Sequence, residues 1–311
     1  MSRRRRGHLR VVPAGLFAAI LLFAGCSSGA GGSTPSAPGS ATVAGPVPTS
    51  PSVPTAVTPT PSAPSSPPSA TPPVTGSPQP ARHPLFPLTP GFQSVRTGAV
   101  NKGNRRLEHR LVFTVTDVSK TIDGRTAVAG IDQDFDGGEL AEQSLEFFVI
   151  DQGAVRYLGS YTETYEGGQF VNSTDAWLSG VRGGRSGILL PASPRPGSGS
   201  FTEAFVPGEG AATGKVVKTG QKQCVPFRCF TDVVVVEEGG SELKYYAPGV
   251  GGIKTEPLSG DPQETEELVN VTTLSPVGLA KLSDEVVRLD RHARSVSRDV
   301  YGTSSPAERH G

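Results

Sequence analysis

The feature that most constrains the fold is a series of short β-rich runs, separated by glycine-containing turns, between residues 83 and 273. Residues 111–116 read Leu-Val-Phe-Thr-Val-Thr, a period of two that sends alternate side chains to opposite faces of a strand. Asp123-Gly124 and Asp151-Gln152-Gly153 lie between such runs and are typical of hairpin turns. The pattern predicts a mainly β domain of about ten to twelve strands, an antiparallel meander forming an open or closed barrel or a sandwich. The sequential hairpins favour the barrel-like sheet.

One helix is predicted, directly after the β-rich region. Ser275 and Pro276 form an N-cap followed by Pro at the first helical position. Apolar residues then recur at intervals of three or four, the spacing of a single helical stripe: Leu279, Leu282, Val286, Leu289 and Ala293. Basic residues lie mainly on its other faces. We expect a helix that docks through its apolar stripe and leaves the basic face in solvent; the alternative is a surface helix whose basic face contacts anionic lipid or wall polymer. We expect a C-terminal amphipathic helix over residues 274–301 and a disordered tail over residues 302–311.

The N-terminal 25 residues have the organisation of a secretory signal peptide. Arg3 to Arg6 and Arg10 form a basic head, and the uncharged stretch from Val11 to Ala24 is largely apolar. A basic region, an apolar core of about 14 residues and a small-residue exit define such a signal. The apolar stretch is shorter than the roughly 20 residues that span a bilayer. The sequence predicts cleavage after Gly25, with an uncleaved membrane helix as the alternative.

Residues 23–26, Phe-Ala-Gly-Cys, resemble the lipobox of bacterial lipoproteins. In that class the thiol is acylated and the bond before the cysteine is cut, which implies cleavage between Gly25 and Cys26 and a diacylglyceryl group on Cys26. Two acyl chains hold a protein stably on a membrane, whereas one chain does so only marginally. The motif departs from the usual pattern because Phe23 occupies the position that normally carries Leu. The resemblance implies attachment to the extracytoplasmic face of the cell membrane; the alternative is secretion with a free cysteine.

The segment after Cys26 is predicted to be a disordered linker that reaches residue 82. Between Ser27 and Pro80 there is no charged and no aromatic residue, and Pro, Ser, Thr, Ala, Gly and Val make up almost all of it. Such a segment buries too little apolar surface to offset the entropy of ordering. Its frequent prolines favour an extended spacer that reaches on the order of 160 Å when fully extended.

The charge balance excludes nucleic acid as an expected partner. The chain has 29 Lys and Arg and 29 Asp and Glu. Removal of residues 1–25, which hold five Arg and no acidic residue, leaves 24 basic against 29 acidic residues, a net charge of −5. A mildly acidic protein lacks the basic surface that binds phosphate backbones.

The two remaining cysteines, Cys224 and Cys229, are predicted to form a disulfide. An even pair in a protein outside the cytoplasm is most simply oxidised. The four residues between them, with a Pro, suit a short loop between strands. A metal site is the alternative, but no His and no second Cys pair lies nearby in the sequence.

Asp132, Asp134 and Asp136, followed by Gly137-Gly138, resemble the start of a calcium loop. The twelfth position of such a loop should be acidic and is Gln143 here, and no helix pattern flanks the stretch. A strand that ends in an Asp-Gly-Gly hairpin turn explains the same residues. We expect no metal site, with calcium at these aspartates as the open alternative.

No catalytic or cofactor motif is found. GxSxG, HExxH and GxxxxGK[ST] are absent from the sequence. His109 lies between Glu108 and Arg110, a setting typical of a solvated surface histidine. We therefore assign no catalytic residue and no cofactor, and expect a protein that is not an enzyme.

Four short motifs carry a further resemblance: residues 83–88 (HPLFPL), 177–181 (WLSGV), 187–192 (GILLPA) and 244–251 (KYYAPGVG). Together they resemble a family of secreted bacterial β-rich proteins with no assigned function, and the long Pro-rich tether is similar to those of actinobacterial lipoproteins. In the last motif, Tyr245 and Tyr246 should point to opposite faces of a strand, and Ala-Pro-Gly-Val has the composition of a type II turn. The resemblance implies an envelope protein and supplies no active site.

These observations lead to one expected function and two rivals. The expected function is a lipid-anchored envelope lipoprotein with a non-catalytic β domain that binds a small apolar or amphipathic ligand in an open barrel. The aromatic residues that suggest this ligand are Phe147, Phe148, Tyr157, Tyr161 and Trp177. The first rival is a structural or adhesion module that contacts cell-wall components. The second is a hydrolase whose site carries no recognisable motif.

Overall fold

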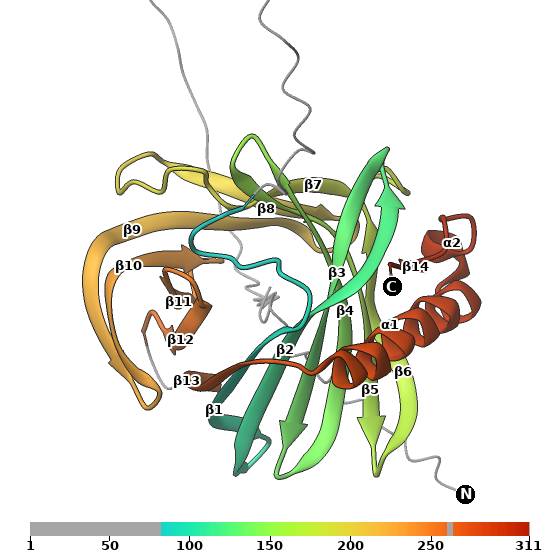
Figure 1. Cartoon of the computed structure of the whole chain (residues 1–311), viewed down its shortest axis with the longest axis horizontal. Helices are drawn as coiled ribbons and strands as arrows, with labels where there is room; N and C mark the ends of the chain where they lie inside the picture. Colours follow the sequence, from blue (N-terminus) through green and yellow to red (C-terminus); the bar gives the residue numbers. More distant parts are fainter. Residues whose placement is uncertain (1–81, 260–263, 311) are drawn as a thin grey trace, which may run out of the picture. The chain divides into compact units, whose positions relative to one another are not determined.

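The computed structural model describes residues 82–259 and 264–310. The predicted signal peptide (1–25), the acylation site at Cys26 and the linker up to residue 81 lie outside the described residues. In the described part, antiparallel strands form one sheet, followed by two helices near the C-terminus (Figure 1). In chain order the elements are β1 (Phe92–Lys102), β2 (Arg105–Ile122), β3 (Arg125–Asp136), β4 (Glu139–Asp151), β5 (Ala154–Glu166), β6 (Gln169–Leu178), β7 (Arg185–Leu190), β8 (Ser200–Val206), β9 (Gly210–Val225), β10 (Arg228–Glu238), β11 (Glu242–Ala247), β12 (Gly251–Pro257), β13 (Glu264–Thr273), α1 (Pro276–Val296), α2 (Arg298–Tyr301) and β14 (Glu308–Arg309).

Twelve of these strands close into a barrel. Most neighbours in the ring are also neighbours in sequence, and β1 closes the ring because it pairs with β2 on one side and β13 on the other. The hairpin turns have the required backbone: Asp123 and Gly124, for example, both have positive φ, at 50° and 71°. Such two-residue turns match the twist of the flanking strands. The predicted mainly β, barrel-like antiparallel meander is therefore confirmed, and the barrel is closed.

Two strands lie off the ring and extend the sheet beyond it. The first residues of β5, from Val155 to Tyr157, pair with β7, whereas the rest of that edge, from Gly159 onward, pairs with β6. At the other side, the end of β2 pairs with β14. The strands β2 to β5 thus provide an outer face broad enough to receive a helix.

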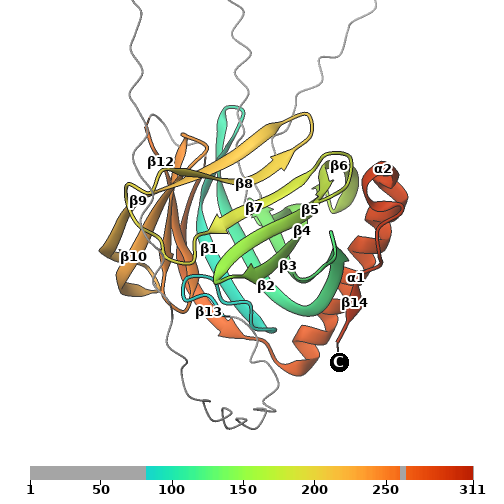
Figure 2. The ribbon, with the colours of Figure 1, turned by 90° about the horizontal axis from the view of Figure 1, so that it is seen from above.

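Helix α1 packs on the outer face of these strands, as Figure 2 shows. Its buried stripe of Val286, Leu289 and Ala293 contacts a cluster that includes Phe147 and Leu158. The helix begins as predicted: the Ser275 hydroxyl accepts a hydrogen bond from the Gly278 amide at 3.2 Å, and Pro276 is the first helical residue. The packing supports the docking interpretation of this helix.

The C-terminal residues differ from the expected disordered tail. Beyond α2, Glu308 and Arg309 form β14 against β2, and Ala307 is buried. The reason is a buried carboxylate on α1: Asp290 accepts hydrogen bonds from Lys120 Nζ at 2.7 Å and from the Ala307 amide at 3.0 Å. Because burial of a charged carboxylate is costly unless it is paired and hydrogen-bonded, the bond from Asp290 to the Ala307 amide stabilises the end of the chain against the sheet.

Loss of the Lys120–Asp290 pair should strongly destabilise the domain. Both side chains are almost fully buried, so Lys120→Met leaves a buried charge without its cation, a change that typically lowers the free energy of unfolding by about 3–5 kcal/mol. Arg288→Met is the matched control, because Arg288 pairs with Glu285 at 2.6 Å in a partly exposed setting, where a pair contributes about 1 kcal/mol or less. Urea unfolding measures both. Equal losses in the two variants would contradict the assignment.

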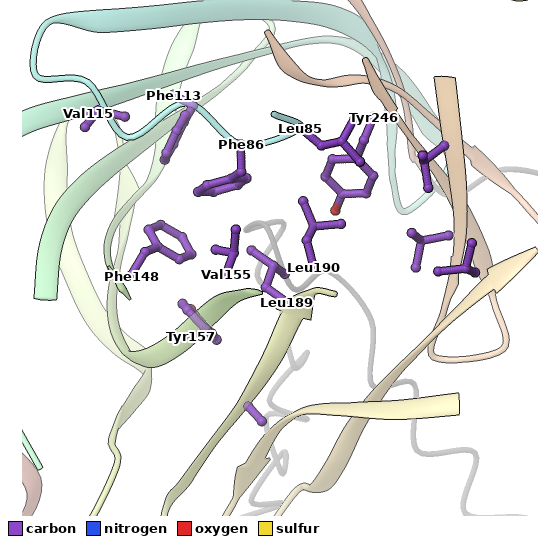
Figure 3. Packing of buried hydrophobic residues seen from close by; sticks show 14 of the residues in the cluster. Leu85, Phe86, Phe113, Val115, Phe148, Val155, Tyr157, Leu189, Leu190 and Tyr246 are labelled. Atoms are coloured by element: carbon purple, nitrogen blue, oxygen red, sulfur yellow. The ribbon is translucent and has the colours of Figure 1, made fainter. Parts of the chain in front are cut away.

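The segment before β1 fills one part of the barrel interior. Leu85 and Phe86 are buried and point into the aromatic core (Figure 3). The Phe86 ring lies 4.9 Å from the Phe148 ring, centroid to centroid, in an edge-on arrangement. His83 fixes the segment, since its Nε2 lies 3.2 Å from the Pro191 carbonyl oxygen. The first residues of the domain are therefore part of its core.

Candidate functional site: an acidic barrel interior

The inner face of β2 carries the polar residue His109 and then, toward the end of the strand, the apolar residues Leu111, Phe113 and Val115. Leu111, Phe113 and Val115 share one face of β2, as their alternation predicted, and this face belongs to the barrel core. The ladder pairs Phe113 with Asp132, Leu111 with Asp134 and His109 with Asp136. Because residues paired across an antiparallel ladder share a face of the sheet, the aspartates follow the inner face of β3. Apolar residues and carboxylates thus divide the interior between them.

Within the barrel, buried acidic side chains outnumber buried basic ones. On the strands that the structure describes, the inward-facing buried basic side chains are three: Arg96, His109 and Lys244. The inward-facing buried acidic side chains are seven: Asp132, Asp134, Glu142, Glu146, Glu203, Glu238 and Glu266. We call these ten residues the acidic interior. Charges removed from water are stable only when they are paired, hydrogen-bonded or neutralised.

The three cations of the acidic interior are already engaged. Arg96 Nε lies 2.6 Å from Glu266 Oε2, and Lys244 Nζ lies 2.7 Å from Glu238 Oε2. His109 Nδ1 lies 2.8 Å from Oδ1 of Asp136, a carboxylate at the end of β3.

Several carboxylate oxygens of the acidic interior have no hydrogen-bond partner among residues 82–259 and 264–310. They include both oxygens of Asp132, Oδ1 of Asp134, Oε2 of Glu146 and Oε1 of Glu203. Such groups are rare in native interiors and call for an explanation.

Burial changes the protonation of this cluster. It raises the pKa of Asp132 to about 7, although the nearby Arg96 lowers it. Burial also raises the pKa values of Asp134, Glu146 and Glu203 well above their ordinary values. A proton can therefore neutralise these carboxylates, and so can a bound cation.

The expectation for His109 is wrong. Its side chain is fully buried, not a solvated surface group. The charged neighbours Glu108 and Arg110 suggested a surface position for His109, but their side chains lie on the opposite face of the strand. Burial lowers the pKa of His109, but the hydrogen bond with Asp136 and the neighbouring Glu264 and Glu266 outweigh it and raise the pKa to about 11.

The aspartates of the suspected calcium loop belong to a strand. Asp132, Asp134 and Asp136 are the last alternate residues of β3, and Gly137-Gly138 forms the hairpin turn to β4. A strand that ends in a hairpin turn therefore accounts for the backbone conformation of residues 132–138. A calcium loop requires a turn that brings successive ligands around one ion, and a strand does not provide it.

A small pocket opens beside the acidic interior. It lies between the segment around Phe86 and the inner faces of β1, β2, β11, β12 and β13, and has a volume of about 40 Å³. The pocket is lined by the aromatic residues Phe92 and Tyr246 and by charged residues that include Glu242, Glu264 and Glu266. A volume of this size holds about three water molecules or a small ion.

The Lys244–Gly251 motif forms one wall of this pocket. Tyr245 and Tyr246 lie on opposite faces of β11 as predicted, and the Tyr246 hydroxyl donates to Glu238 Oε1 at 2.9 Å. The predicted type II turn is also present: Gly249 has φ 79° and the Val250 amide donates to the Ala247 carbonyl at 3.3 Å. Of this motif, Lys244, Tyr246, Val250 and Gly251 line the pocket.

The other residues singled out in the sequence lie elsewhere. Cys224 and Cys229 form a disulfide across the β9–β10 hairpin, and neither lines the pocket. The aromatic residues expected to bind a ligand are core: Phe148, Tyr157 and Trp177 in the barrel, Phe147 and Tyr161 under α1.

The residues that the sequence did not single out include Arg96, Glu242, Glu264 and Glu266. The signal that could have revealed them is the presence of polar residues at alternate positions of a strand, such as Glu264 and Glu266 in β13.

Comparison with protein-family models, with curated proteins and with solved structures found no match. Within the described residues, neither helix has the length and apolar character needed to cross a bilayer.

Proposed function

We propose that the chain is a lipid-anchored envelope protein whose barrel is a non-catalytic, cation-binding module. The observation that carries the proposal is the acidic interior, in which seven buried carboxyl groups face three buried basic groups. Each basic group already has an acidic partner within 2.8 Å. Buried oxygens of Asp132, Asp134, Glu146 and Glu203 that have no hydrogen-bond partner among the described residues favour a species that brings positive charge into the barrel.

The dimensions of the interior favour a small cation over the apolar or amphipathic ligand expected from the sequence. The aromatic side chains that suggested such a ligand pack against one another, as Phe148 and Tyr157 do with ring centroids 5.4 Å apart. Sites for drug-sized ligands have volumes of roughly 300–1,000 Å³, whereas the pocket has about 40 Å³. An ion with one or two waters fits this volume.

The membrane attachment rests on the sequence. The basic head, the apolar stretch from Val11 to Ala24 and the cysteine at position 26 support a cleaved signal and an acylated thiol. The uncharged segment from Ser27 to Pro80 then supports a spacer that holds the barrel away from the extracytoplasmic membrane face.

Among the described residues, a Ser–His pair is a geometric candidate for the hydrolase alternative. Ser119 Oγ lies 2.5 Å from His310 Nε2. The pair is exposed at the β2–β14 edge and is not part of the pocket lining. Nucleophilic catalysis also requires a site that excludes water and stabilises an oxyanion. The Ser119–His310 pair is exposed to water, which favours a non-catalytic domain.

Cations should stabilise the protein against thermal unfolding. We expect a raised Tm at pH 7 when chelator-treated full-length protein is titrated with Mg²⁺, Ca²⁺, Mn²⁺, Zn²⁺ or tetramethylammonium, because a ligand of the folded state at 100 times its Kd stabilises by about 2.7 kcal/mol. Asp134→Asn should reduce the effect, whereas Asp284→Asn, on the exposed face of α1, should not. If no cation raises the Tm, the barrel does not bind cations, and a structural or adhesion module that contacts cell-wall components becomes the better description.

A further inference from the structure

Three side chains of the acidic interior and its rim converge on one point. His109 Nε2 lies 3.4 Å from Glu264 Oε1 and 3.6 Å from Glu266 Oε1. One ligand atom from each residue lies within 4.8 Å of the other two. An imidazole and two carboxylates are ligands that divalent transition metals use in proteins.

The distances suit metal ligands better than hydrogen bonds. Nitrogen and oxygen atoms that share a hydrogen are normally about 2.7–3.2 Å apart. Two ligands at about 2.0–2.1 Å from a tetrahedral ion lie about 3.3–3.4 Å from each other. The separations from His109 Nε2 to the two glutamates are thus close to the edges of such a coordination shell.

The state of His109 is a second and independent observation. Its side chain is fully buried, and Nε2 has no hydrogen-bond partner in the part of the chain that the structure describes. The ring is held from its other side, since Nδ1 lies 2.8 Å from Asp136 Oδ1, and Asp136 is itself paired with Lys102 at 2.9 Å. A carboxylate that accepts from Nδ1 fixes the orientation of the ring, the usual arrangement of metal-binding histidines. A metal ion that binds at Nε2 would displace the proton that this nitrogen carries in the metal-free protein.

The sheet positions the three ligands through β1, which lies between β2 and β13 (Figure 1). Gly98 of β1 is paired with His109 on one side and with Glu266 on the other. A Cβ at position 98 would overlap the Thr265 carbonyl, so glycine allows β1 and β13 to approach closely at this point. Glu264 lies two residues before Glu266 on the same face, and Arg96 holds Glu266 Oε2, which leaves Oε1 directed toward His109.

We propose that His109, Glu264 and Glu266 form a binding site for a divalent transition-metal ion of the Zn²⁺ class, with Asp136 positioning the histidine. The inference rests on the proposed cation-binding function and names the cation. The nitrogen ligand selects against Ca²⁺ and Mg²⁺, which prefer all-oxygen sites.

The test is metal binding by the full-length protein, purified in detergent and stripped with a chelator. We expect one Zn²⁺ per chain by elemental analysis after dialysis, and a Kd measured by calorimetry that weakens at least 100-fold in His109→Gln and in Glu264→Gln. His292→Gln is the matched control, because His292 also has a carboxylate partner, Glu163 at 2.5 Å, but lies on α1 outside the cluster. It should bind Zn²⁺ as the parent does.

Co²⁺ provides a readout that a merely structural role would not affect. Bound to the parent and to His292→Gln, it should give the intense visible absorption of a low-symmetry site, and the circular dichroism of each variant reports whether it folds. Asp136→Asn should keep the fold and weaken Zn²⁺ binding about 10- to 100-fold.

The outcomes separate the two proposals. Zn²⁺ binding that persists in folded His109→Gln, or preferential binding of Ca²⁺ or tetramethylammonium, overturns the metal site and leaves a cation-binding barrel. Absence of binding by every cation overturns both.

Discussion

The Cys26→Ser protein is expected in the soluble fraction of lysed cells, whereas the parent protein sediments with membranes. A serine hydroxyl does not accept the diacylglyceryl group, so the mature chain loses both acyl chains, each of which contributes about 0.8 kcal/mol of membrane affinity per buried CH₂. Fractionation followed by intact-mass measurement checks the prediction, because the parent should carry the mass of the lipid.

The control is a Cys224→Ser, Cys229→Ser double variant, which removes the disulfide but keeps Cys26. It should remain with membranes at the lipidated mass. If Cys26→Ser stays in the membrane fraction and its mass differs from that of the parent only by the substitution, there is no lipid anchor. An uncleaved N-terminal helix would then explain the attachment.

The stability of the chelator-treated protein should fall as the pH rises from 5 to 8. Burial raises the pKa of Asp132 from 3.8 to about 7 and that of Glu242 from 4.5 to about 7. Between these values the folded state holds protons that the unfolded state has released, so the free energy of unfolding decreases with increasing pH. The two groups correspond to a loss of about 4 and about 3 kcal/mol, respectively, once the pH has passed both values.

The other charged groups around Asp132 do not reverse this direction. Of its neighbours, Arg96 and Lys244 remain protonated throughout, with pKa values above the ordinary ones. Glu266 has a lowered pKa because Arg96 outweighs its burial, so its contribution is lost only in acid. The raised pKa of His109 acts in the same direction as that of Asp132, because the folded state keeps the imidazole proton above the pH at which the unfolded state loses it.

Urea unfolding at several pH values, with Asp132→Asn as the diagnostic variant, measures the effect. The variant should lose part of the pH dependence, since an amide does not titrate. Glu139→Gln, at the exposed turn of the same hairpin, should keep it. A stability that is flat or rises between pH 5 and 8 in the absence of cations would show that the acidic interior is not neutralised by protons.

The sequence alone determined the local structure of this domain. The period of two in residues 111–116 divided the side chains of β2 between two faces because side chains of a strand alternate by geometry. Asp123-Gly124 identified a hairpin because few residues accept positive φ at two successive positions. Ser275 and Pro276 marked the start of α1 because a helix N-terminus needs an acceptor and tolerates a residue without an amide hydrogen.

Only the tertiary structure decided what the charged residues do. His109 lies 155 positions before Glu264 in the sequence, and the two meet because β1 closes the barrel between β2 and β13. The sequence neighbours of His109 are charged, so local composition predicted a surface position for its side chain. The strands that surround His109 in space instead place the side chain in the barrel interior. The same holds for Asp290, whose partners on β2 and at Ala307 order a tail that was expected to be disordered. The physical reason is that burial and charge pairing depend on long-range contacts, and the pairing of distant strands sets those contacts.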